Sequence, residues 1–446
     1  MKKIKLTVTL LLFSIVIFSQ NIPNYNELMT RTQWWSDARF GMFIHFGAYS
    51  VAARGEWVKS NEKMTTEQYQ RYIDAFNPID YDAKKWAKIA KQAGMKYAVL
   101  TVKHHDGYCL FDSKLTDYKL SNRFNGRDLV REFLDAFRAE GLKVGLYYSI
   151  IDWHHKDYPN VGNHPQAGNP EWNKKTYNWD NYLKYMFGQI EELVTNYGKI
   201  DLMWFDYSFD DYVGEKWKAT ELLKMCRKYQ PDMITDNRLN GSGDNYSLTY
   251  GDFVTPEQAI PEISIKDNQG RLLPWETCLT LNNHWGYVAS DQDWKPYEVI
   301  IQSLVDCVSK NGNLLLNVGP DGKGNIPKQS IEILKQVGDW MQKNGESIYG
   351  CGQSDLAKPE WGYFTQKGNS IYAHWCYPKI GPINVKGVSQ KVRTTTLLSN
   401  GAELPVSRKW WGLTGEDNFF INTSSPLNHT FLLPDKADAV IKIELK

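Results

Sequence analysis

Four aspartates surround the apolar run Leu202–Phe205 in the stretch KIDLMWFDYSFDD, and their positions suit them to different tasks. Asp201 precedes the run, Asp206 follows it directly, and Asp210 and Asp211 come after further aromatic residues. The run has the length and composition of a buried strand. In a barrel of parallel strands, catalytic groups lie at the carboxyl ends of the strands, whereas the opposite ends serve stability. Asp206 is therefore the predicted reactive acid, Asp201 a structural acid, and the last two are solvated loop residues.

An acid at this position needs a second carboxylate if it works without a metal, a nucleotide loop or a Ser/His partner. Cleavage of a glycosidic bond through an oxocarbenium-like transition state uses such a pair. Three glutamates follow the fifth predicted strand, Glu257 in GDFVTPEQ, Glu262 in IPEIS and Glu276 in LPWETC. They lie in a long irregular segment, where cleft-edge loops are expected. The residues favour glycoside hydrolysis and leave the second acid open among these three.

Polar side chains also follow the other predicted strands, whose bodies are apolar. These residues are His45, Lys103, His104, His105, Asp106, Tyr147, Asp152, Asp236 and Arg238. If the strands are parallel, all of them meet at one end of the sheet. Polar residues without a common function would be scattered along the strands. Their position at the strand ends therefore predicts one site.

Several of these residues also have a purely structural interpretation. His45 could be a hydrogen-bonded core histidine, and Tyr147 and Arg238 could be structural. The pair His104 and His105 suggests a metal site, but neighbouring residues of a strand point to opposite faces, and no HExxH motif is present. We therefore predict no metal, and neutral imidazoles that hydrogen-bond to sugar hydroxyls.

The elements that must position these groups alternate between strand and helix as far as residue 349. Predicted strands are Gly41–Phe46, Tyr97–Val102, Val144–Ser149, Leu202–Phe205, Met233–Thr235, Cys278–Leu281 and Asn313–Val318. Predicted helices are Asp82–Ala93, Asp128–Glu140, Trp179–Tyr197, Trp217–Tyr229, Tyr297–Ser309 and Lys328–Asn344. This order favours a (β/α)8 TIM-like barrel with one or two irregular units. An open doubly wound sheet is the alternative, although no GxGxxG or GxxxxGK[ST] motif follows a strand.

The ends of the chain differ from the barrel region. Residues 350–446 contain short strand-like runs separated by Gly, Pro, Asn and Asp, which predicts an all-β sandwich. Residues 1–19 combine three lysines with an apolar run that is short for a membrane span, which predicts a cleavable signal peptide and an exported, periplasmic or secreted protein. A retained anchor is the alternative. Residues 20–349 then form the barrel domain.

Composition narrows the possible partners. The 52 Lys and Arg residues nearly balance the 51 Asp and Glu residues, so neither a nucleic-acid nor a membrane-surface partner is predicted. The 17 Trp and 26 Tyr residues are numerous, and flat aromatic faces suit sugar rings. The six cysteines lack CxxC pairing and are predicted to be buried hydrophobes, with Cys351 and Cys376 the pair to test for a disulfide. The sequence indicates no oligomeric state.

The chain resembles the α-L-fucosidases of glycoside hydrolase family 29 from about Trp34 to its end. The resemblance rests on motifs that occur in the family's order: RFGMFIHFGAYSV, GEWV, TVKHHDGYCLFDS, RDLV, GLYYSIIDWH, LMWFD, TDNR, GDFVTPEQ, PWETC with HWGY, and SKNGNLLLNVGPDGKGNIP. It implies a barrel with a C-terminal β-sandwich that hydrolyses terminal α-L-fucose with retention of configuration. No cofactor or metal is implied, and the partner is a fucosylated oligosaccharide or glycoconjugate.

The same resemblance implies roles for individual residues. Asp206 would be the nucleophile and Glu257 the general acid/base, with Glu276 as the rival for the second role. The residues implied to hold the fucose hydroxyls and the nucleophile are His45, Glu56, Trp57, His104, His105, Tyr147 and Arg238. Phe43 and Trp285 would form the apolar wall for the fucose methyl group, and Tyr207 a further wall.

Two expectations and two alternatives accompany these roles. Arg238 should keep Asp206 ionised, while desolvation should raise the pKa of Glu257 so that it can donate a proton. The alternatives are a related exo-glycosidase that acts on α-L-galactosides, and a non-catalytic sugar-binding barrel. The linkage that is cleaved, whether α1,2, α1,3, α1,4 or α1,6, depends on loops for which the sequence makes no prediction.

Overall fold

A seven-stranded parallel sheet forms the centre of the computed structural model, which describes residues 24–241, 246–389, 391–410, 413–414, 417–423, 430–431 and 433–446. Its order is β5-β4-β3-β2-β1-β7-β6. The strands are β1 (Phe40–Ile44), β2 (Tyr97–Lys103), β3 (Lys143–Ser149), β4 (Leu202–Asp206), β5 (Ile234–Thr235), β6 (Glu276–Thr280) and β7 (Asn313–Val318). Each overlaps its predicted run, because parallel strands covered on both faces are apolar almost throughout.

The sheet curls into a barrel that is completed by an irregular segment. Residues 252–258 lie between β5 and β6, with the single parallel bridges Asp236 to Phe253, Val254 to Trp275 and Glu257 to Cys278. Backbone hydrogen bonds support both sides, including Asp252 N to Thr235 O at 2.7 Å and Gln258 N to Cys278 O at 3.0 Å. This segment occupies the place of an eighth strand, so the TIM-like barrel is confirmed with one irregular unit.

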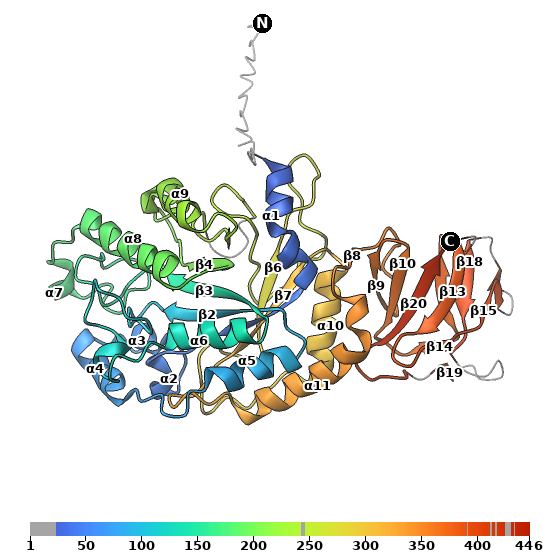
Figure 1. Cartoon of the computed structure of the whole chain (residues 1–446), viewed down its shortest axis with the longest axis horizontal. Helices are drawn as coiled ribbons and strands as arrows, with labels where there is room; N and C mark the ends of the chain where they lie inside the picture. Colours follow the sequence, from blue (N-terminus) through green and yellow to red (C-terminus); the bar gives the residue numbers. More distant parts are fainter. Residues whose placement is uncertain are drawn as a thin grey trace, which may run out of the picture.

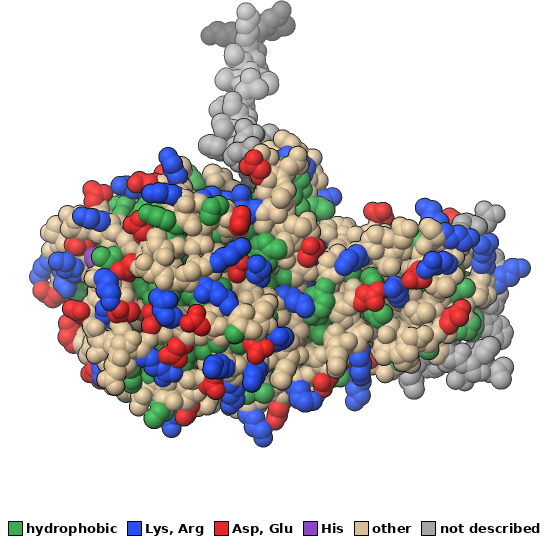
Figure 2. Space-filling view, viewed as in Figure 1, with side chains coloured by type: hydrophobic (Ala, Val, Ile, Leu, Met, Phe, Trp, Pro, Cys, Tyr) green, Lys and Arg blue, Asp and Glu red, His purple; other side chains and the backbone are tan. Residues whose placement is uncertain are grey.

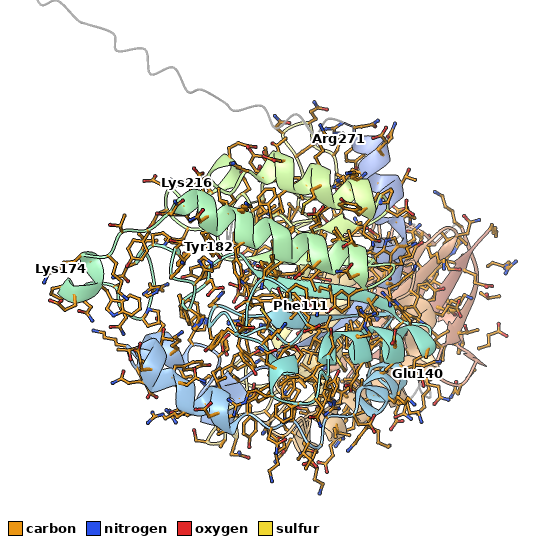
Figure 3. All side chains as sticks on the ribbon, turned by 60° about the vertical axis from the view of Figure 1, so that its left-hand side comes forward. Phe111, Glu140, Lys174, Tyr182, Lys216 and Arg271 are labelled. Atoms are coloured by element: carbon orange, nitrogen blue, oxygen red, sulfur yellow. The ribbon has the colours of Figure 1, made fainter. Side chains whose placement is uncertain are left out.

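Helices cover the outside of the sheet (Figure 1). The predicted ones are α5 (Ala83–Gln92), α6 (Leu129–Ala139), α8 (Trp179–Asn196), α9 (Ala219–Tyr229), α10 (Tyr297–Val308) and α11 (Lys328–Asn344). Figure 3 shows α8 and α6 covering one side of the sheet; of the residues it labels, Tyr182 and Phe111 are buried, whereas Lys174 and Lys216 are exposed. The apolar stripe of each helix faces the sheet, as expected for such helices.

Side-chain caps fix where several helices begin. Asp82 and Asp128 accept backbone N–H groups at the starts of α5 and α6, which satisfies donors that the helix cannot pair internally. Five helices were not predicted: α1 (Tyr25–Ala38), α2 (Tyr49–Ala52), α3 (Val58–Asn61), α4 (Thr66–Ala75) and α7 (Pro170–Asn173). Of these, α4 carries a capping box of Thr65 and Gln68.

The C-terminal region is built from antiparallel sheets. Its larger sheet has the order β14-β13-β20-β10-β9-β8 and its three-stranded sheet the order β12-β18-β15, with two further two-stranded pairs. The strands are β8 (Gly352–Gln353), β9 (Gly362–Lys367), β10 (Ser370–Trp375), β11 (Lys379–Ile380), β12 (Ile383–Lys386), β13 (Val392–Leu397), β14 (Ala402–Glu403), β15 (Val406–Ser407), β16 (Lys409–Trp410), β17 (Leu413–Thr414), β18 (Asn418–Ile421), β19 (Thr430–Phe431) and β20 (Ala439–Leu445). Trp375, Ile383 and Phe419 belong to one apolar core between the sheets, which confirms a sandwich.

The sandwich packs on α10 and α11 at one end of the barrel (Figure 1). Trp340 Nε1 on α11 donates to the backbone oxygen of Asp438 at 3.0 Å, and Gln302 Nε2 on α10 donates to that of Ala437, also at 3.0 Å. On the barrel side, the short 3-10 turn Gly345–Ser347 precedes β8. The two parts therefore share a buried, hydrogen-bonded boundary.

Three further predictions concern the ends, the surface and the cysteines. The predicted signal peptide, residues 1–19, lies outside the described residues. Within residues 24–446, apart from the gaps given above, no helix is long and apolar enough to span a membrane. Acidic and basic side chains are interspersed over the face shown in Figure 2.

All six cysteines are buried and unpaired, so Cys351 and Cys376 form no disulfide.

Candidate active site

The carboxyl ends of the central strands and the loops that follow them form one small pocket of about 120 Å³. It is lined by every residue for which a catalytic or sugar-binding role was expected: Phe43, His45, Glu56, Trp57, His104, His105, Tyr147, Asp206, Arg238, Glu257 and Trp285. Trp204, Tyr207 and Cys278 complete the lining. Sites for drug-sized ligands measure roughly 300–1,000 Å³, so this pocket has the scale of a single sugar ring.

Asp206 is the last residue of β4, and its carboxylate is held on both oxygens. Tyr147 donates from its hydroxyl to Oδ2 at 2.6 Å, and Arg238 donates from Nη1 to Oδ1 at 3.0 Å. The next residue, Tyr207, has a φ of 83°, which turns the chain sharply away from the strand. The nucleophile candidate is thus fixed by two neighbouring strand ends.

Arg238 joins the two carboxylates of the pocket. Its Nη2 lies 2.8 Å from Oε2 of Glu257, while Nη1 contacts Asp206. The guanidinium carbon also lies 4.4 Å from the centre of the Trp204 ring. Only 4% of the Arg238 side chain is exposed, so both ion pairs are strong compared with surface pairs.

This arrangement reverses the pKa shift that was expected for Glu257. Burial raises the pKa of Asp206, the charge of Glu257 raises it further, and Arg238 and Tyr147 offset only part of the change. Burial also acts to raise the pKa of Glu257, but the ion pair and hydrogen bond with Arg238 outweigh it and hold that pKa below its usual value. The prediction for Glu257 was wrong because Arg238 pairs with both acids, and 35% of the Glu257 side chain remains exposed.

Two histidines present a hydrogen-bond acceptor to the pocket. His45 Nδ1 lies 2.7 Å from Oδ1 of Asn317, whose amide group donates to the Trp285 carbonyl, so His45 Nδ1 must be the donor. His105 Nδ1 lies 2.8 Å from Oγ of Ser149, which donates its own proton to the Ile151 carbonyl.

Burial keeps both of these rings neutral. It lowers the pKa of His45 to about 4 and that of His105 well below its ordinary value. Each Nε2 is therefore unprotonated, and that of His105 lies 3.9 Å from Oδ2 of Asp206. A sugar hydroxyl that donates a hydrogen bond would find an acceptor at both rings.

The structure corrects the argument used against a shared role for His104 and His105. We expected the two rings to point to opposite faces, but both line the pocket, with ring centroids 4.1 Å apart. Strand β2 ends at Lys103, and its register with β3 shifts between Thr101 and Lys103, so the two histidines leave the strand alternation. His104 stacks on Tyr147 at 5.4 Å, which supports the ring that binds Asp206.

Glu56 and the aromatic residues form the remaining walls. Glu56 is buried and accepts the backbone N–H of Gly286 at 2.7 Å, and burial raises its pKa although that hydrogen bond opposes the change. Phe43 contacts Trp285 and Trp204 with ring centroids 5.9 and 5.2 Å away, and Trp57 contacts Tyr207 at 5.3 Å. The pocket therefore combines polar groups with flat aromatic surfaces, as sugar sites do.

Comparison with known proteins agrees with this geometry. The family model for α-L-fucosidase matches residues 18–346, most of the chain. The chain belongs to the α-L-fucosidase family. It is a glycoside hydrolase, and the expected resemblance to family 29 is confirmed. An α-L-fucosidase of Dictyostelium discoideum is 30% identical over 379 residues, which cover 78% of each chain.

Solved fucosidase structures share the two-domain architecture. Alpha-L-fucosidase isoenzyme 1 of Paenibacillus thiaminolyticus is 52% identical, with a TM-score of 0.90 over 94% of this chain and 99% of that one. A family 29 fucosidase of Bacteroides thetaiotaomicron, described as a trapped covalent intermediate in complex with 2-fluoro-fucosyl fluoride, is 27% identical with a TM-score of 0.79, covering 94% and 96% of the two chains.

The other acids of this fucosidase-family chain lie away from the pocket. Glu276 begins β6, at the opposite end of the barrel, where it accepts hydrogen bonds from Tyr97 and, at 3.2 Å, from Trp35. Burial raises the pKa of Glu276 to about 7. Glu262 is exposed on the loop, and Asp210 and Asp211 are exposed beyond β4. Glu257 is the only one of the three candidate glutamates that lines the pocket.

Several polar residues at the strand ends are structural in this fold. Lys103 and Asp152 form a fully buried ion pair at 3.1 Å, and Asp106 accepts the Tyr69 hydroxyl at 2.8 Å. Asp201, at the base of β4, binds Lys143 at 3.1 Å, as expected for a stabilising acid. Trp204 and Cys278 were not predicted as pocket residues, because an apolar residue within a strand carries no sequence signal that it faces a site rather than the core.

Proposed function

We propose that this protein removes terminal α-L-fucose from glycans by double displacement with net retention of configuration. The observation that supports this most directly is the pair of carboxylates, Asp206 and Glu257, joined by one buried guanidinium in a pocket the size of one sugar. Retaining glycosidases hold their two carboxyl groups about 5–5.5 Å apart, which leaves no room for a water between sugar and nucleophile. The covalent intermediate described for the Bacteroides relative supports the same course.

In the first step, a carboxylate oxygen of Asp206 attacks the anomeric carbon while the bond from that carbon to the leaving oxygen breaks. Glu257 delivers a proton to the leaving oxygen, and Asp206 becomes a neutral ester. In the second step, Glu257 takes a proton from water, whose oxygen displaces Asp206 and restores the starting anomer. Tyr147 and Arg238 hold Asp206 in line for both steps.

The charges of the pocket suit this sequence. In the free site, Arg238 keeps Glu257 ionised, so Glu257 has to acquire its proton as the sugar binds and excludes water. Once Asp206 is esterified, the like charge beside Glu257 is gone, and a lost like charge favours the ionised form of an acid. Glu257 is then a stronger acid and is left as the carboxylate that activates water, the state that the second step requires.

Fucose itself is favoured by the shape and polarity of the walls. The acceptors at His45, His105 and Glu56 face hydroxyl donors, while Phe43 and Trp285 offer an apolar surface to the methyl group of a 6-deoxy sugar. An α-L-galactoside places a CH₂OH group there instead. Such a difference is worth about 1–3 kcal/mol, so we expect a preference for fucosides of roughly 10- to 200-fold.

The test is hydrolysis of an aryl α-L-fucoside by the purified protein, with the corresponding α-L-galactoside beside it. Asp206→Gly should lower kcat by more than about 1,000-fold, because the attacking group is lost. Azide should partly restore turnover and yield the fucosyl azide of opposite anomeric configuration. Rescue of Glu257→Ala by azide should instead give the azide with retained configuration.

Glu276→Gln is the matched control for the second acid. It should give no azide product, because Glu276 lies outside the pocket. Failure of the unmodified protein to release fucose from either an aryl fucoside or a set of natural fucosylated glycans would contradict the proposal. If azide rescued Glu276→Gln while Glu257→Ala kept its full activity, the acid/base role would belong to Glu276.

We further propose that the protein acts after export, because its first 19 residues have the charge and length of a secretory signal. N-terminal sequencing of protein recovered from the producing cells would show whether the chain begins after Ser19.

A further inference from the structure

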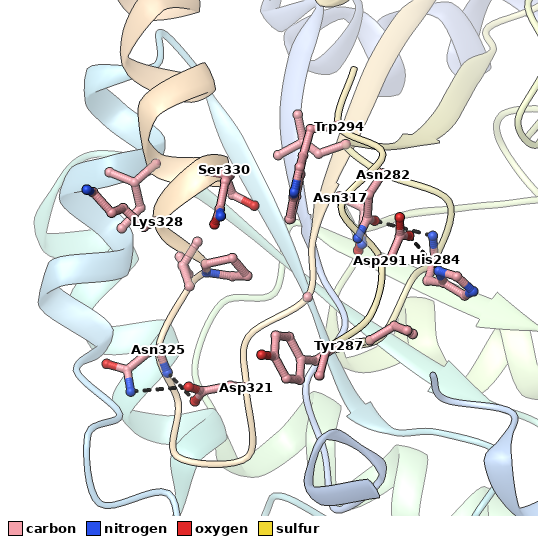
Figure 4. A pocket seen from close by; sticks show the side chains of 18 of the residues that line it. Asn282, His284, Tyr287, Asp291, Trp294, Asn317, Asp321, Asn325, Lys328 and Ser330 are labelled. Carbon is pink, nitrogen blue, oxygen red and sulfur yellow. Dashed lines mark hydrogen bonds and ion pairs between the residues drawn. The ribbon is translucent and has the colours of Figure 1, made fainter. Parts of the chain in front are cut away.

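A second cavity, of about 520 Å³, lies beside the proposed fucose pocket and has no role in the chemistry above. It is lined by the loop 281–294, by the end of β7 and by the first turn of α11 (Figure 4). Gly286 and Asn317 line it, and both also contact the fucose pocket, through Glu56 and His45 respectively. The two cavities are therefore neighbours that share a wall.

One side of this cavity is the start of a long helix without a side-chain cap. Pro327 is the N-cap residue of α11, which runs for 17 residues, and no side chain accepts its first N–H groups. The first N–H groups of a helix have no internal partner, and the helix dipole favours negative charge at this end. This feature alone is common to most helices.

Two buried polar atoms, one on the buried Ser330 and one on the half-buried Trp294, make the cavity specific. Ser330, on the first turn of α11, has no exposed surface, and its Oγ has no hydrogen-bond partner in the structure. Trp294 lies on the loop before α10, and its buried Nε1 also lacks a partner. Figure 4 shows both residues on the lining of the same cavity, from two different elements. A buried polar group without a partner is costly, so a ligand at this position would remove that cost.

The carboxylates that line the cavity are already occupied. Asp291 accepts from His284 Nδ1 at 2.6 Å and from the backbone N–H of Asn283 at 2.9 Å. Asp321 accepts the backbone N–H groups of Lys323 and Asn325 at 2.9 and 3.0 Å. The unsatisfied groups are therefore mainly donors, and the exposed Lys85 and Lys328 add positive charge at the rim. An acceptor-rich, negatively charged group complements these donors.

We propose that this cavity binds an oxyanion, a sulfate, phosphate or carboxylate group, at the start of α11 between Ser330 and Trp294. The group has two possible sources with the same chemistry, a substituent on a sugar of the glycan or a free anion. The site does not depend on the proposed hydrolytic function, because none of its donors belongs to the fucose pocket.

The test titrates the full chain with sodium sulfate and follows thermal unfolding, with sodium chloride at matched ionic strength as the reference. A ligand that binds the folded chain raises Tm as its concentration rises. We expect sulfate to raise Tm beyond chloride in the unmodified protein. Ser330→Ala and Trp294→Phe, which each remove one donor, should weaken sulfate binding about tenfold or more.

Ser303→Ala is the matched control, because this exposed serine on α10 bonds only within its own helix and should leave sulfate binding unchanged. Galactose 6-sulfate and glucuronate are titrated beside galactose to separate the sources. Binding of a sulfated or carboxylated sugar at least tenfold tighter than inorganic sulfate assigns the oxyanion to the glycan, and equal affinity assigns it to a free anion. The proposal is overturned if sulfate and phosphate act no differently from chloride, or if both site variants retain full sulfate binding.

Discussion

Arg238 determines more of the pocket's chemistry than either carboxylate does. It contacts Asp206 and Glu257 with different nitrogens, so the ionisation of each acid depends on the other through a single cation. Two carboxylates and one guanidinium leave one net negative charge in a buried site. That charge complements the positive charge that develops at the anomeric carbon in the proposed reaction.

Glu276 gives a prediction about stability at the residue scale. Burial raises its pKa from an ordinary 4.5 to about 7, so between these values the folded chain binds a proton that the unfolded chain has lost. Stability therefore falls as pH rises through this window and stays lower above it. We expect the unmodified protein to lose about 2–3 kcal/mol relative to Glu276→Gln between pH 4.5 and 8.

Urea unfolding at a series of pH values measures this difference. The exposed Glu171→Gln on α7 serves as the control, and its profile should run parallel to that of the unmodified protein. If the stability of Glu276→Gln also changed with pH as that of the unmodified protein does, Glu276 would not retain its proton in the folded chain.

At the scale of elements, the irregular segment 252–258 carries Glu257 into the site. Its first residues bond to the β5 side, and from Val254 onward its backbone bonds to β6 and the residues just before β6, which fixes the height of Glu257 above the barrel. Gly251 directly precedes the segment, and a Cβ atom there would lie 2.2 Å from the backbone oxygen of Asp236. Only glycine permits the backbone to approach this closely.

Gly251→Ala should therefore displace the segment and with it Glu257. We expect kcat on an aryl fucoside to fall at least about 100-fold, because general acid/base groups contribute roughly 10²- to 10⁴-fold, while the chain loses 1–3 kcal/mol of stability. Gly270→Ala is the control at the far end of the same loop, where a Cβ would meet open space and only the positive φ is unfavourable. An active Gly251→Ala would contradict the assigned role of this contact.

Elements buried on both faces could be predicted from sequence, and elements fixed by tertiary contacts could not. The run at Asn313–Val318 was predicted with its observed bounds, because a central parallel strand is continuously apolar. The segment 252–258 has no such run, since it bonds to its neighbours through single bridges. Helix α4 could have been found from its capping box, Thr65 with Gln68, whereas α1 has neither a strong apolar stripe nor a family motif.

The same distinction applies to the residues of the site. Asp206 and Arg238 follow strands, so strand polarity alone placed them at the correct end. Their pKa shifts depend on a third group, Glu257, whose approach to Arg238 is set by the irregular segment and leaves no trace in the sequence. The histidine pair was misjudged for a related reason, because the end of β2 and its register shift are properties of the folded sheet.

At the scale of the whole molecule, the sandwich is attached to the barrel by buried contacts. Thr365 donates to the Ser347 carbonyl at 2.7 Å, and Tyr372 donates to Glu346 at 2.7 Å. Together with Trp340 and Gln302, these bonds join β9, β10 and the start of β20 to the helices of the barrel. An interface of this kind couples the unfolding of the two domains.

We expect the full chain to unfold in a single calorimetric transition. Trp340→Phe keeps the ring and removes the hydrogen bond to Asp438, so it should lower stability by about 1 kcal/mol and shift the whole transition. Trp172→Phe, at the opposite end of the barrel, is the control and should have little effect. Two separate transitions in the unmodified protein would show that the domains are independent.

The volume of the fucose pocket also has a kinetic consequence. A cavity of about 120 Å³ encloses one sugar and leaves the remainder of the glycan outside. Under the proposed function, each encounter therefore releases one monosaccharide. Free fucose would make the same contacts as a fucosyl unit in this pocket, so we expect the released product to compete with the next substrate and turnover to slow as the sugar accumulates around the enzyme.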